Sequence, residues 1–417
     1  MGKSVAATAM LITLIACGDS STGPSGSEPN PSTLVLHDVS WRYAEMYWSS
    51  CPNSDFASYR LYRSDTPNIE ADTSSASLLY ITTSVMDTTC SDNTISESTT
   101  YFYALVTSGS SGLSSWSNEI AVSVPEGSPD SVITTVAVGN DPRGICALPS
   151  GTHVYVTNGG DDNVSVIRAS DNTVVDNIDV GSNPYGICPL PSGEFVYVAN
   201  FSDGSVSAIR TMDNTVFATV SVGAGPRSIC SLPYGDYVYV TNRGDDNVAV
   251  VRTSDNTVVA TVNVGNLPTG ICALPSGNYV YVGDRGGNGS VSVIRASDNI
   301  VVATVGVGSP PENLCSLPSG QYVYVAHDDG VSVIRTSDNT VVETITLGGY
   351  TSGICSLPSG EYVYVTNDNS VSIIRTSDNK VIADLDAGSD LLDICSLPSG
   401  EYVYLVNGHY DCVSVMQ

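Results

Sequence analysis

A cysteine followed by Leu-Pro-Ser-Gly and then by a Tyr-Val-Tyr-Val run recurs through the C-terminal part of the chain. One copy, residues 354–367, reads ICSLPSGEYVYVTN. Its cysteine has equivalents separated by 42, 42, 42, 43, 40 and 40 residues, at Cys146, Cys188, Cys230, Cys272, Cys315, Cys355 and Cys395. A period near 40 residues predicts a propeller or a solenoid.

Each period contains four segments with the composition of strands. In order they read Gly-Ile-Cys-x-Leu-Pro, Tyr-Val-Tyr-Val, Val-Ser-Val-Ile-Arg and Thr-Val-Val-Ala-Thr-Val, and Gly, Asn-Asp or Ser-Asp-Asn turns separate them. Alternating β-branched and aromatic residues favour strands. Four antiparallel strands per repeat make one propeller blade, so the sequence predicts an all-β fold.

The two ends of the repeat region predict how the ring closes. The last repeat stops after its third strand, at residues 412–417, and an extra copy of the fourth strand precedes the first repeat, at residues 131–139. An open solenoid would need capping repeats. We therefore expect a seven-bladed β-propeller over residues 131–417. Its last blade would take its outer strand from the N-terminal side, which uses every predicted strand and leaves no unpaired strand at either end.

The second strand carries a recurring tetrapeptide. It reads Tyr-Val-Thr-Asn at residues 155–158, 239–242 and 364–367. In this respect the chain resembles the YVTN-type β-propeller repeat family over residues 131–417. That resemblance implies kinship with bacterial surface and lipoprotein propellers and with archaeal surface-layer proteins.

Residues 32–125 have a different pattern, with short alternating segments and Ser, Asn or Asp turns that predict a β-sandwich. The order Asp87-Thr88, then residues 100–103 (Thr-Tyr-Phe-Tyr), then residues 117–119 (Ser-Asn-Glu) resembles a fibronectin type III domain. Cys51 and Cys90 are the two cysteines of this segment, and we expect a disulfide between them if the protein is exported; the alternative is two unrelated thiols. Residues 126–130 form a short linker.

The N-terminus has the pattern of an export signal. Residues 1–17 contain Lys3, an apolar stretch too short to span a bilayer comfortably, and a Leu-Ile-Ala-Cys sequence that resembles a bacterial lipobox. We expect lipidation of Cys17, and a plain secretory signal is the alternative. Residues 18–31 form a flexible Gly/Ser/Pro tether. The expected location is the cell envelope: the outer membrane, its periplasmic face or the cell surface, with membrane attachment through the lipid alone.

The charge balance excludes one class of partner. Only 15 Lys and Arg residues oppose 43 Asp and Glu residues, for a formal net charge of -28. Such a chain repels phosphate backbones, so we expect no nucleic-acid partner.

The sequence also has no Gly-x-Ser-x-Gly, His-Glu-x-x-His or Cys-x-x-Cys motif. We therefore expect no cofactor, no metal site and no enzymatic activity.

The repeated cysteine is expected to fill space between neighbouring blades. Packed sheets lie about 10 Å apart, whereas a disulfide requires Cα atoms within about 7 Å. Equivalent cysteines should therefore stay unpaired as small buried side chains. A metal or redox ring is the alternative. Cys412 has no equivalent in the other repeats, and the sequence offers no reason for it.

The repeats disagree at the residue just before the Gly-Ile-Cys glycine. Loops on a rigid scaffold often carry binding function, so a ligand site on this face is our prediction. Neutral drift of exposed residues is the alternative. The candidate residues are Arg143, Tyr185, Arg227, Thr269, Glu312, Ser352 and Leu392.

The sequence thus predicts a monomeric, non-enzymatic binding or scaffold protein of the cell envelope. Its partner would be an envelope protein, a glycan or a small ligand. The alternatives are a propeller enzyme, either a lactonase-like hydrolase or a dehydrogenase subunit, and a structural surface-layer component.

The opposite face carries Arg-x-x-Asp-Asn turns, such as Arg168 to Asn172. In these turns we expect the arginine to pair with the nearby aspartate.

Overall fold

The structure is a computed structural model that describes residues 32–39, 44–51, 56–71, 76–86, 88–92, 100–123 and 131–417. The predicted signal (1–17), with Cys17, the tether (18–31) and the linker (126–130) lie outside these residues. The chain divides into two compact units, Met1–Ser128 and Pro129–Gln417, and each is described by itself. The described segments include no helix long and apolar enough to cross a membrane.

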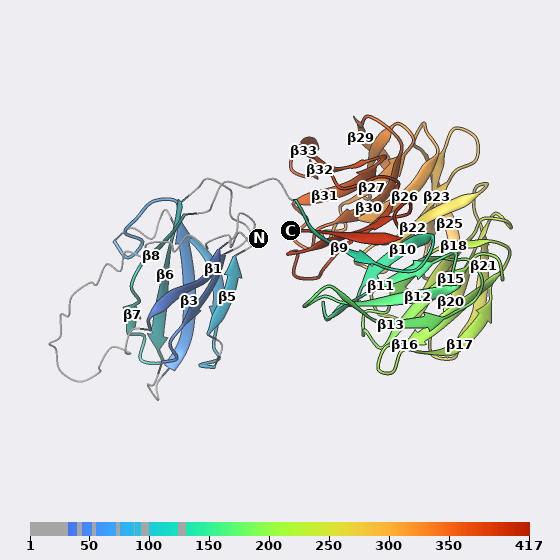
Figure 1. Ribbon diagram of the computed structural model, residues 1–417. Coiled ribbons are helices and arrows are strands. Elements are labelled where there is room, and N and C mark those ends of the chain that lie inside the picture. The colour runs from blue at the N-terminus through green and yellow to red at the C-terminus, as the bar shows by residue number, and fades with distance from the viewer. Residues whose placement is uncertain are drawn as a thin grey trace, which may run out of the picture. The chain divides into compact units, whose positions relative to one another are not determined.

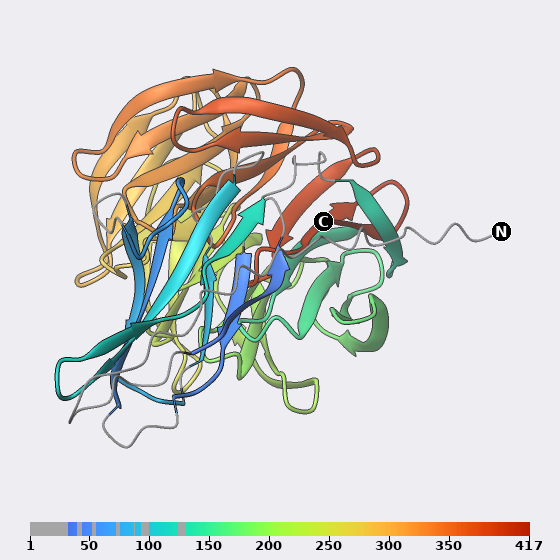
Figure 2. The ribbon, with the colours of Figure 1, turned by 90° about the vertical axis from the view of Figure 1, so that its left-hand side faces the viewer.

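The first unit contains two antiparallel sheets, whose strands run from blue to teal in Figure 2. One has the order β1-β2-β5; the other has the order β4-β3-β6-β7, with β8 paired to β6. The strands are β1 (Leu34–Val39), β2 (Ala44–Trp48), β3 (Phe56–Ser64), β4 (Ser77–Thr82), β5 (Thr89–Asp92), β6 (Thr100–Gly109), β7 (Ser114–Trp116) and β8 (Ile120–Ser123).

The two sheets share one apolar core. It includes Trp48 from one sheet and Tyr59 from the other, with ring centroids 5.7 Å apart. Cys51 is buried in this core and Cys90 packs against it. The structure contains no disulfide between these two residues, so the bridge stays a prediction.

The second unit consists of repeated four-stranded antiparallel sheets, as the four segments per repeat predict. In sheet order, the strands are β10 (Pro142–Ala147), β11 (His153–Asn158), β12 (Asn163–Arg168) and β13 (Thr173–Asp179); β14 (Pro184–Pro189), β15 (Phe195–Asn200), β16 (Ser205–Arg210) and β17 (Thr215–Ser221); β18 (Pro226–Ser231), β19 (Tyr237–Asn242), β20 (Asn247–Arg252) and β21 (Thr257–Asn263); β22 (Pro268–Ala273), β23 (Tyr279–Asp284), β24 (Ser290–Arg295) and β25 (Ile300–Gly306); β26 (Pro311–Ser316), β27 (Tyr322–His327), β28 (Gly330–Arg335) and β29 (Thr340–Thr346); β30 (Thr351–Ser356), β31 (Tyr362–Asn367), β32 (Ser370–Arg375) and β33 (Lys380–Asp386); and β34 (Leu391–Ser396), β35 (Val403–Asn407), β36 (Cys412–Met416) and β9 (Val132–Ala137).

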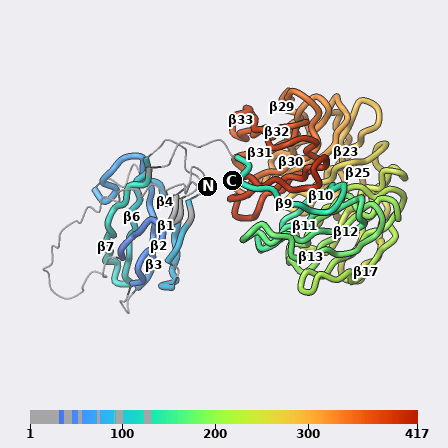
Figure 3. Tube along the Cα trace, in the orientation of Figure 1, coloured from blue at the N-terminus to red at the C-terminus, as the bar shows by residue number. Residues whose placement is uncertain are grey.

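These sheets are arranged in a closed ring. The first strand of each sheet contacts the first strand of the next, and β34 contacts β10. In Figure 1 the sheets follow one another from green through yellow to red around a common centre. The last sheet is completed by β9, whose residues pair antiparallel with β36, and Figure 3 shows this strand beside the C-terminus. The N-terminal strand thus completes the last sheet, as the sequence predicts.

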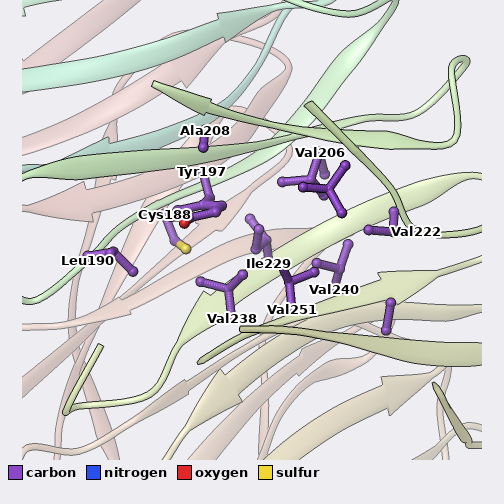
Figure 4. Packing of buried hydrophobic residues seen from close by; sticks show 13 residues of the cluster. Cys188, Leu190, Tyr197, Val206, Ala208, Val222, Ile229, Val238, Val240 and Val251 are labelled. Carbon is purple, nitrogen blue, oxygen red and sulfur yellow. The ribbon is translucent and has the colours of Figure 1, made fainter. Parts of the chain in front are cut away.

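The apolar core lies between neighbouring sheets. One cluster joins Cys188 and Tyr197 of one sheet to Ile229, Val238 and Val240 of the next, and Figure 4 shows Cys188 beside Tyr197. Burial raises the pKa of the Cys188 thiol to about 12, which keeps this thiol protonated at neutral pH. Cys188 and its cluster neighbours together fill the space between two sheets.

A hydrogen bond from a tyrosine of a second strand to an asparagine in the turn between the third and fourth strands also joins neighbouring sheets. The buried Tyr155 side chain donates through its hydroxyl to the Asn214 side-chain oxygen at 2.9 Å, and Tyr197 bonds Asn256 in the same way at 2.7 Å. Asn214 has a φ of 52°, a left-handed conformation that asparagine tolerates better than most residues. The Asp-Asn turn therefore both reverses the chain and accepts a bond from the preceding sheet.

Arginines beside these turns pair with the aspartate three residues later, as the sequence predicts. All of these pairs are solvent-exposed, so each contributes little stability. The arginines are Arg168, Arg210, Arg252, Arg295, Arg335 and Arg375.

Candidate functional site

The predicted site residues lie at an irregularity in the first strand of each sheet. In β10 the register with β11 shifts between Pro142 and Ile145, and Arg143 and Gly144 fall inside this shift. The same shift recurs in the other first strands. A bulge of this kind frees a side chain from strand alternation and can re-aim it. Each first strand can therefore present its variable residue toward the place where the first strands meet.

The threonine of Tyr-Val-Thr-Asn holds this irregular backbone. Thr157 accepts a 2.8 Å hydrogen bond from the Gly144 amide through its hydroxyl oxygen, and it donates to the Tyr185 carbonyl of the next sheet at 2.7 Å. Thr241 makes the equivalent pair of bonds, with the Ser228 amide and the Thr269 carbonyl, each at 2.9 Å. The repeat motif thus fixes the backbone on which the candidate site residues stand.

Glycine permits neighbouring first strands to approach closely here. A Cβ added at Gly144 would lie 2.3 Å from the Tyr185 carbonyl oxygen, and one added at Gly186 would lie 2.6 Å from the Arg227 carbonyl oxygen. These contacts are with backbone atoms and cannot be relieved by a side-chain rotation. The glycine of Gly-Ile-Cys is therefore a packing requirement at these two sheets.

A pocket of about 240 Å³ opens where the first strands meet. We call it the first-strand pocket. Six of the predicted site residues line it, and Thr269 does not. Its lining residues are Arg143, Gly144, Tyr185, Gly186, Arg227, Ser228, Glu312, Asn313, Tyr350, Ser352, Leu392 and Asp393.

Thr269 has a structural position instead. Its side chain is 0% exposed, and its hydroxyl donates to the carbonyls of Pro311 (2.8 Å) and Gly283 (3.2 Å). Gly283 occupies the place of the threonine in Tyr-Val-Thr-Asn, so β23 lacks the hydroxyl through which Thr157 and Thr241 bridge to the next sheet. Thr269 supplies that hydroxyl, which is why it turns into the core rather than toward the pocket.

Tyr185 lies between two arginines. The guanidinium carbon of Arg143 is 5.3 Å from the centre of its ring, and that of Arg227 is 5.2 Å away. Both distances are within the range of a cation–π interaction. Phe201 packs against the same ring at 6.0 Å. These contacts hold the aromatic ring in a fixed place in the pocket wall.

Glu312 is a buried carboxylate, 5% exposed, that pairs with two arginines. Arg227 donates to its Oε2 at 2.7 Å, and Arg285 forms an ion pair with its Oε1. Arg285 also lies near the Tyr350 hydroxyl and Asp328, each at 3.5 Å. A single carboxylate therefore orders two cationic side chains on different sheets. Paired in this way, it is a structural acid of the pocket.

Asp393 is the second carboxylate of the pocket, and its environment differs. It accepts from the Ile145 amide at 3.2 Å and from the Asn313 side-chain amide at 3.3 Å. Burial raises its pKa to about 7, and the hydrogen bonds from the Ile394 and Ile145 amides oppose that rise. A carboxyl with a pKa near neutral pH in a cavity can gain or lose its proton when a ligand binds.

Sequence reasoning missed several residues of this region. Asp393, Asn313 and Ser228 replace the glycine of Gly-Ile-Cys in three repeats, and that break in the pattern was a usable signal. Arg243 and Arg285 occupy another variable position, directly after the second strand.

Among the described residues, no group of three or more His, Cys, Asp or Glu side chains could hold a metal ion.

Comparisons with known proteins identify the fold. Hydrazine synthase of Kuenenia stuttgartiensis matches with a TM-score of 0.60 and 20% identity, over 66% of this chain and 95% of that chain. The Cps50 (Swd1) β-propeller domain of Myceliophteria thermophila matches with a TM-score of 0.62 and 12% identity, over 69% of this chain and 99% of that chain. The chain therefore contains a β-propeller built from repeated four-stranded sheets.

The same comparisons do not extend beyond the fold. No protein-family model matches the chain, and no curated protein matches it. In all, 1246 solved chains match its structure, so the fold is too widespread to indicate a function. Function has to be argued from the first-strand pocket itself.

Proposed function

We propose that the chain is an exported, non-enzymatic binding protein of the cell envelope. In this proposal a seven-bladed propeller presents the first-strand pocket, a fibronectin type III-like sandwich precedes it, and a lipid on Cys17 tethers the whole. One observation carries the proposal: the residues at which the repeats disagree gather around one cavity, whereas the repeated residues build the scaffold. The size of the pocket favours a small molecule or one residue of a glycan over an extended protein segment.

The test compares two triple variants of the full chain. One replaces Arg143, Tyr185 and Arg227 in the pocket with alanine, and the other replaces the turn residues Arg168, Arg252 and Arg335. Each protein is incubated with fractionated small-molecule and glycan extracts of the native envelope, and native mass spectrometry detects retained ligand. We expect the original chain and the turn variant to retain a ligand that the pocket variant loses. Equal retention by all three proteins would contradict the proposal.

A hydrolase is the second candidate, and Asp393 is the observation that favours it. A carboxyl with a pKa of about 7 in a cavity suits general acid–base chemistry. Hydrolysis of lactone and ester substrates by the original chain, abolished in Asp393→Asn, would favour this candidate. Turnover that persists unchanged in Asp393→Asn would exclude Asp393 as the acid–base group.

A further inference from the structure

Arginine is scarce in this chain, and its distribution in the second unit is uneven. The arginines that end the third strands each pair with an aspartate three residues later. Four others depart from that pattern. Arg143 and Arg227 line the first-strand pocket. Arg285 and Arg243 lie beside its lining: Arg285 pairs with Glu312, and Arg243 interacts electrostatically with Arg227 and Tyr185. A strongly acidic chain thus concentrates positive charge at one cavity.

Three of these four arginines have carboxylate partners. Arg143 pairs with Asp141 at 2.7 Å, and Glu312 pairs with both Arg227 and Arg285. Asp328 lies 3.5 Å from Arg285 and is a third carboxylate beside these three arginines, so the charges in this group balance.

Arg243 differs from the other three. In the described part of the chain it forms no ion pair, and its Nε is buried without a hydrogen-bond partner. Burial and the nearby charges of Arg227 and Arg285 lower its pKa. A partly buried cation without a partner is costly to hold, because it has lost water and gained no anion.

The nearest acidic residue in sequence does not compensate Arg243. Asp245 accepts a 2.7 Å hydrogen bond from the Ala224 amide through its Oδ2, which ties down the loop before β18. The carboxylate in Arg243-Gly244-Asp245 therefore bonds the backbone through its Oδ2 and forms no ion pair with Arg243. One positive charge at the edge of the pocket remains without an anion from the protein.

The walls of the pocket offer flat and apolar surfaces beside this charge. Tyr185 is held between two arginines, and Tyr350 is 40% exposed, with the Arg285 guanidinium 6.0 Å from its ring centre. Leu392 adds an aliphatic surface. At about 240 Å³ the cavity suits a molecule built on a single ring.

We propose that the first-strand pocket binds a small monoanion composed of one ring and one carboxylate, with the carboxylate paired to Arg243 and the ring against Tyr185 or Tyr350. A planar carboxylate matches the two-pronged geometry of a guanidinium. A single charge matches the single uncompensated arginine. The inference rests on the proposed function, and it specifies the ligand class of that site. Sugar acids and aromatic acids share this chemistry.

The test is calorimetric titration of the full chain with D-glucuronate and benzoate, and with their neutral counterparts D-glucose and benzamide. We expect one or both carboxylates to bind at least about tenfold more tightly than their neutral counterparts, because a hydrogen bond to a charged group is stronger than one between neutral groups. Preference for glucuronate would identify a sugar acid, and preference for benzoate an aromatic acid. Either result supports the inference.

Two variants on the same blade separate a specific role from a general charge effect. Arg243→Gln should weaken carboxylate binding about tenfold or more, while Arg252→Gln, which removes an equal charge from an exposed turn pair, should change it less than about twofold. Arg243→Lys should retain more affinity than Arg243→Gln. Thermal unfolding of each variant checks that it is folded.

The outcomes distinguish this inference from the proposed function. Equal binding of the neutral counterparts, or equal effects of Arg243→Gln and Arg252→Gln, would overturn the carboxylate assignment while leaving a binding pocket in place. Failure of all four probes to bind would also overturn it. The proposed function would then be decided by ligand retention in the triple variants.

Discussion

The hydroxyl of Tyr404 donates a 2.6 Å hydrogen bond to the side-chain oxygen of Asn172, which joins the last sheet of the propeller to the first. The same bond joins sheets that are consecutive in the chain, as between Tyr197 and Asn256 at 2.7 Å. The closing interface therefore has the same chemistry as the internal ones.

The first prediction concerns this closure. Tyr404→Phe should lower the free energy of unfolding by about 0.5–1.5 kcal/mol, because Asn172 loses its donor while the aromatic packing remains. Tyr197→Phe is the matched control within the chain and should lose a similar amount. Denaturant unfolding measures both. A neutral Tyr404→Phe beside a destabilised Tyr197→Phe would show that the last and first sheets do not meet in this way.

The second prediction concerns Asp284, a buried carboxyl at a place where most repeats have asparagine. It is 1% exposed; its Oδ2 accepts from Ser292 at 2.7 Å, and its Oδ1 is buried without a partner. Burial raises its pKa to about 6 from 3.8. The folded state therefore binds a proton more tightly than the unfolded state does, and stability is lost as pH rises from about 4 through 6.

Asp284→Asn should remove this loss. At pH 7.5 we expect the variant to be more stable by about 1–3 kcal/mol, since one pKa unit corresponds to 1.36 kcal/mol. Near pH 4 the two proteins should be equally stable. Unfolding curves at both pH values provide the measurement. A gain that is the same at both values would mean that amide hydrogen bonding, rather than charge, is the cause.

The third prediction concerns Glu312. Glu312→Gln removes the shared partner of Arg227 and Arg285, so the protein should lose about 1–3 kcal/mol of stability. The same change leaves more positive charge around the pocket, so affinity for benzoate should rise. Calorimetry and unfolding on one sample measure both effects.

Asp141→Asn serves as the control for the Glu312→Gln variant. It removes the carboxylate partner of Arg143 at a more exposed position, so stability should change by less than about 1 kcal/mol. A loss of affinity in Glu312→Gln, despite a folded protein, would show that Glu312 contributes to binding in another way.

The fourth prediction concerns the pH dependence of binding. Asp393 has a pKa of about 7, so it loses its negative charge as pH falls from 8 to 6. A carboxylate ligand would then meet less repulsion, and we expect binding of benzoate to strengthen by roughly three- to tenfold over this range. Titrations at pH 6, 7 and 8 measure it. Asp393→Asn should bind with nearly the same affinity at all three, and a retained pH dependence would point to another group.

The fifth prediction concerns Cys51 and Cys90. If the protein is exported, these two residues should form a disulfide that stabilises the first unit by about 2–4 kcal/mol. Both contact one core cluster, which makes the pairing plausible in space. Alkylation of the denatured protein with and without prior reduction, followed by peptide mass spectrometry, shows whether Cys51 and Cys90 are bridged. Complete alkylation of both residues without reduction would exclude the bridge.

The repeating part of the structure was predictable because each feature has a local signature. The spacing of the cysteines gives the repeat length, Tyr-Val-Tyr-Val gives a buried strand, and Ser-Asp-Asn gives a turn in a left-handed conformation. The extra fourth strand before the first repeat was enough to predict that β9 pairs with β36. All of these features depend on periodicity, which a single sequence displays in full.

The site was predictable only in part, because its chemistry depends on which partner each side chain finds. Arg243 and Arg252 both precede an aspartate by a few residues, and although only Arg252 belongs to a repeated Arg-x-x-Asp-Asn turn, the sequence does not show whether Arg243 has a partner. In the structure Arg252 pairs with Asp255, whereas Asp245 is occupied by the Ala224 amide and leaves Arg243 unpaired. Thr269 was wrongly predicted to be a ligand-site residue for a related reason. Its structural role follows from the missing hydroxyl at Gly283 on the neighbouring strand.

Completion of the last sheet by β9 has a mechanical consequence. Any tension applied to the chain ahead of Ser131 enters the propeller through β9, which is held by its pairing with β36 and by Val136 and Val132, which pack against apolar clusters between sheets. Because β9 lies at the opposite edge of its sheet from β34, release of β9 would leave β36 as an unpaired edge, while the contact of β34 with β10 does not involve β9. A load on this segment would thus act first on the outer edge of the last sheet, separated by two strands from the first strand that contributes Leu392 and Asp393 to the pocket.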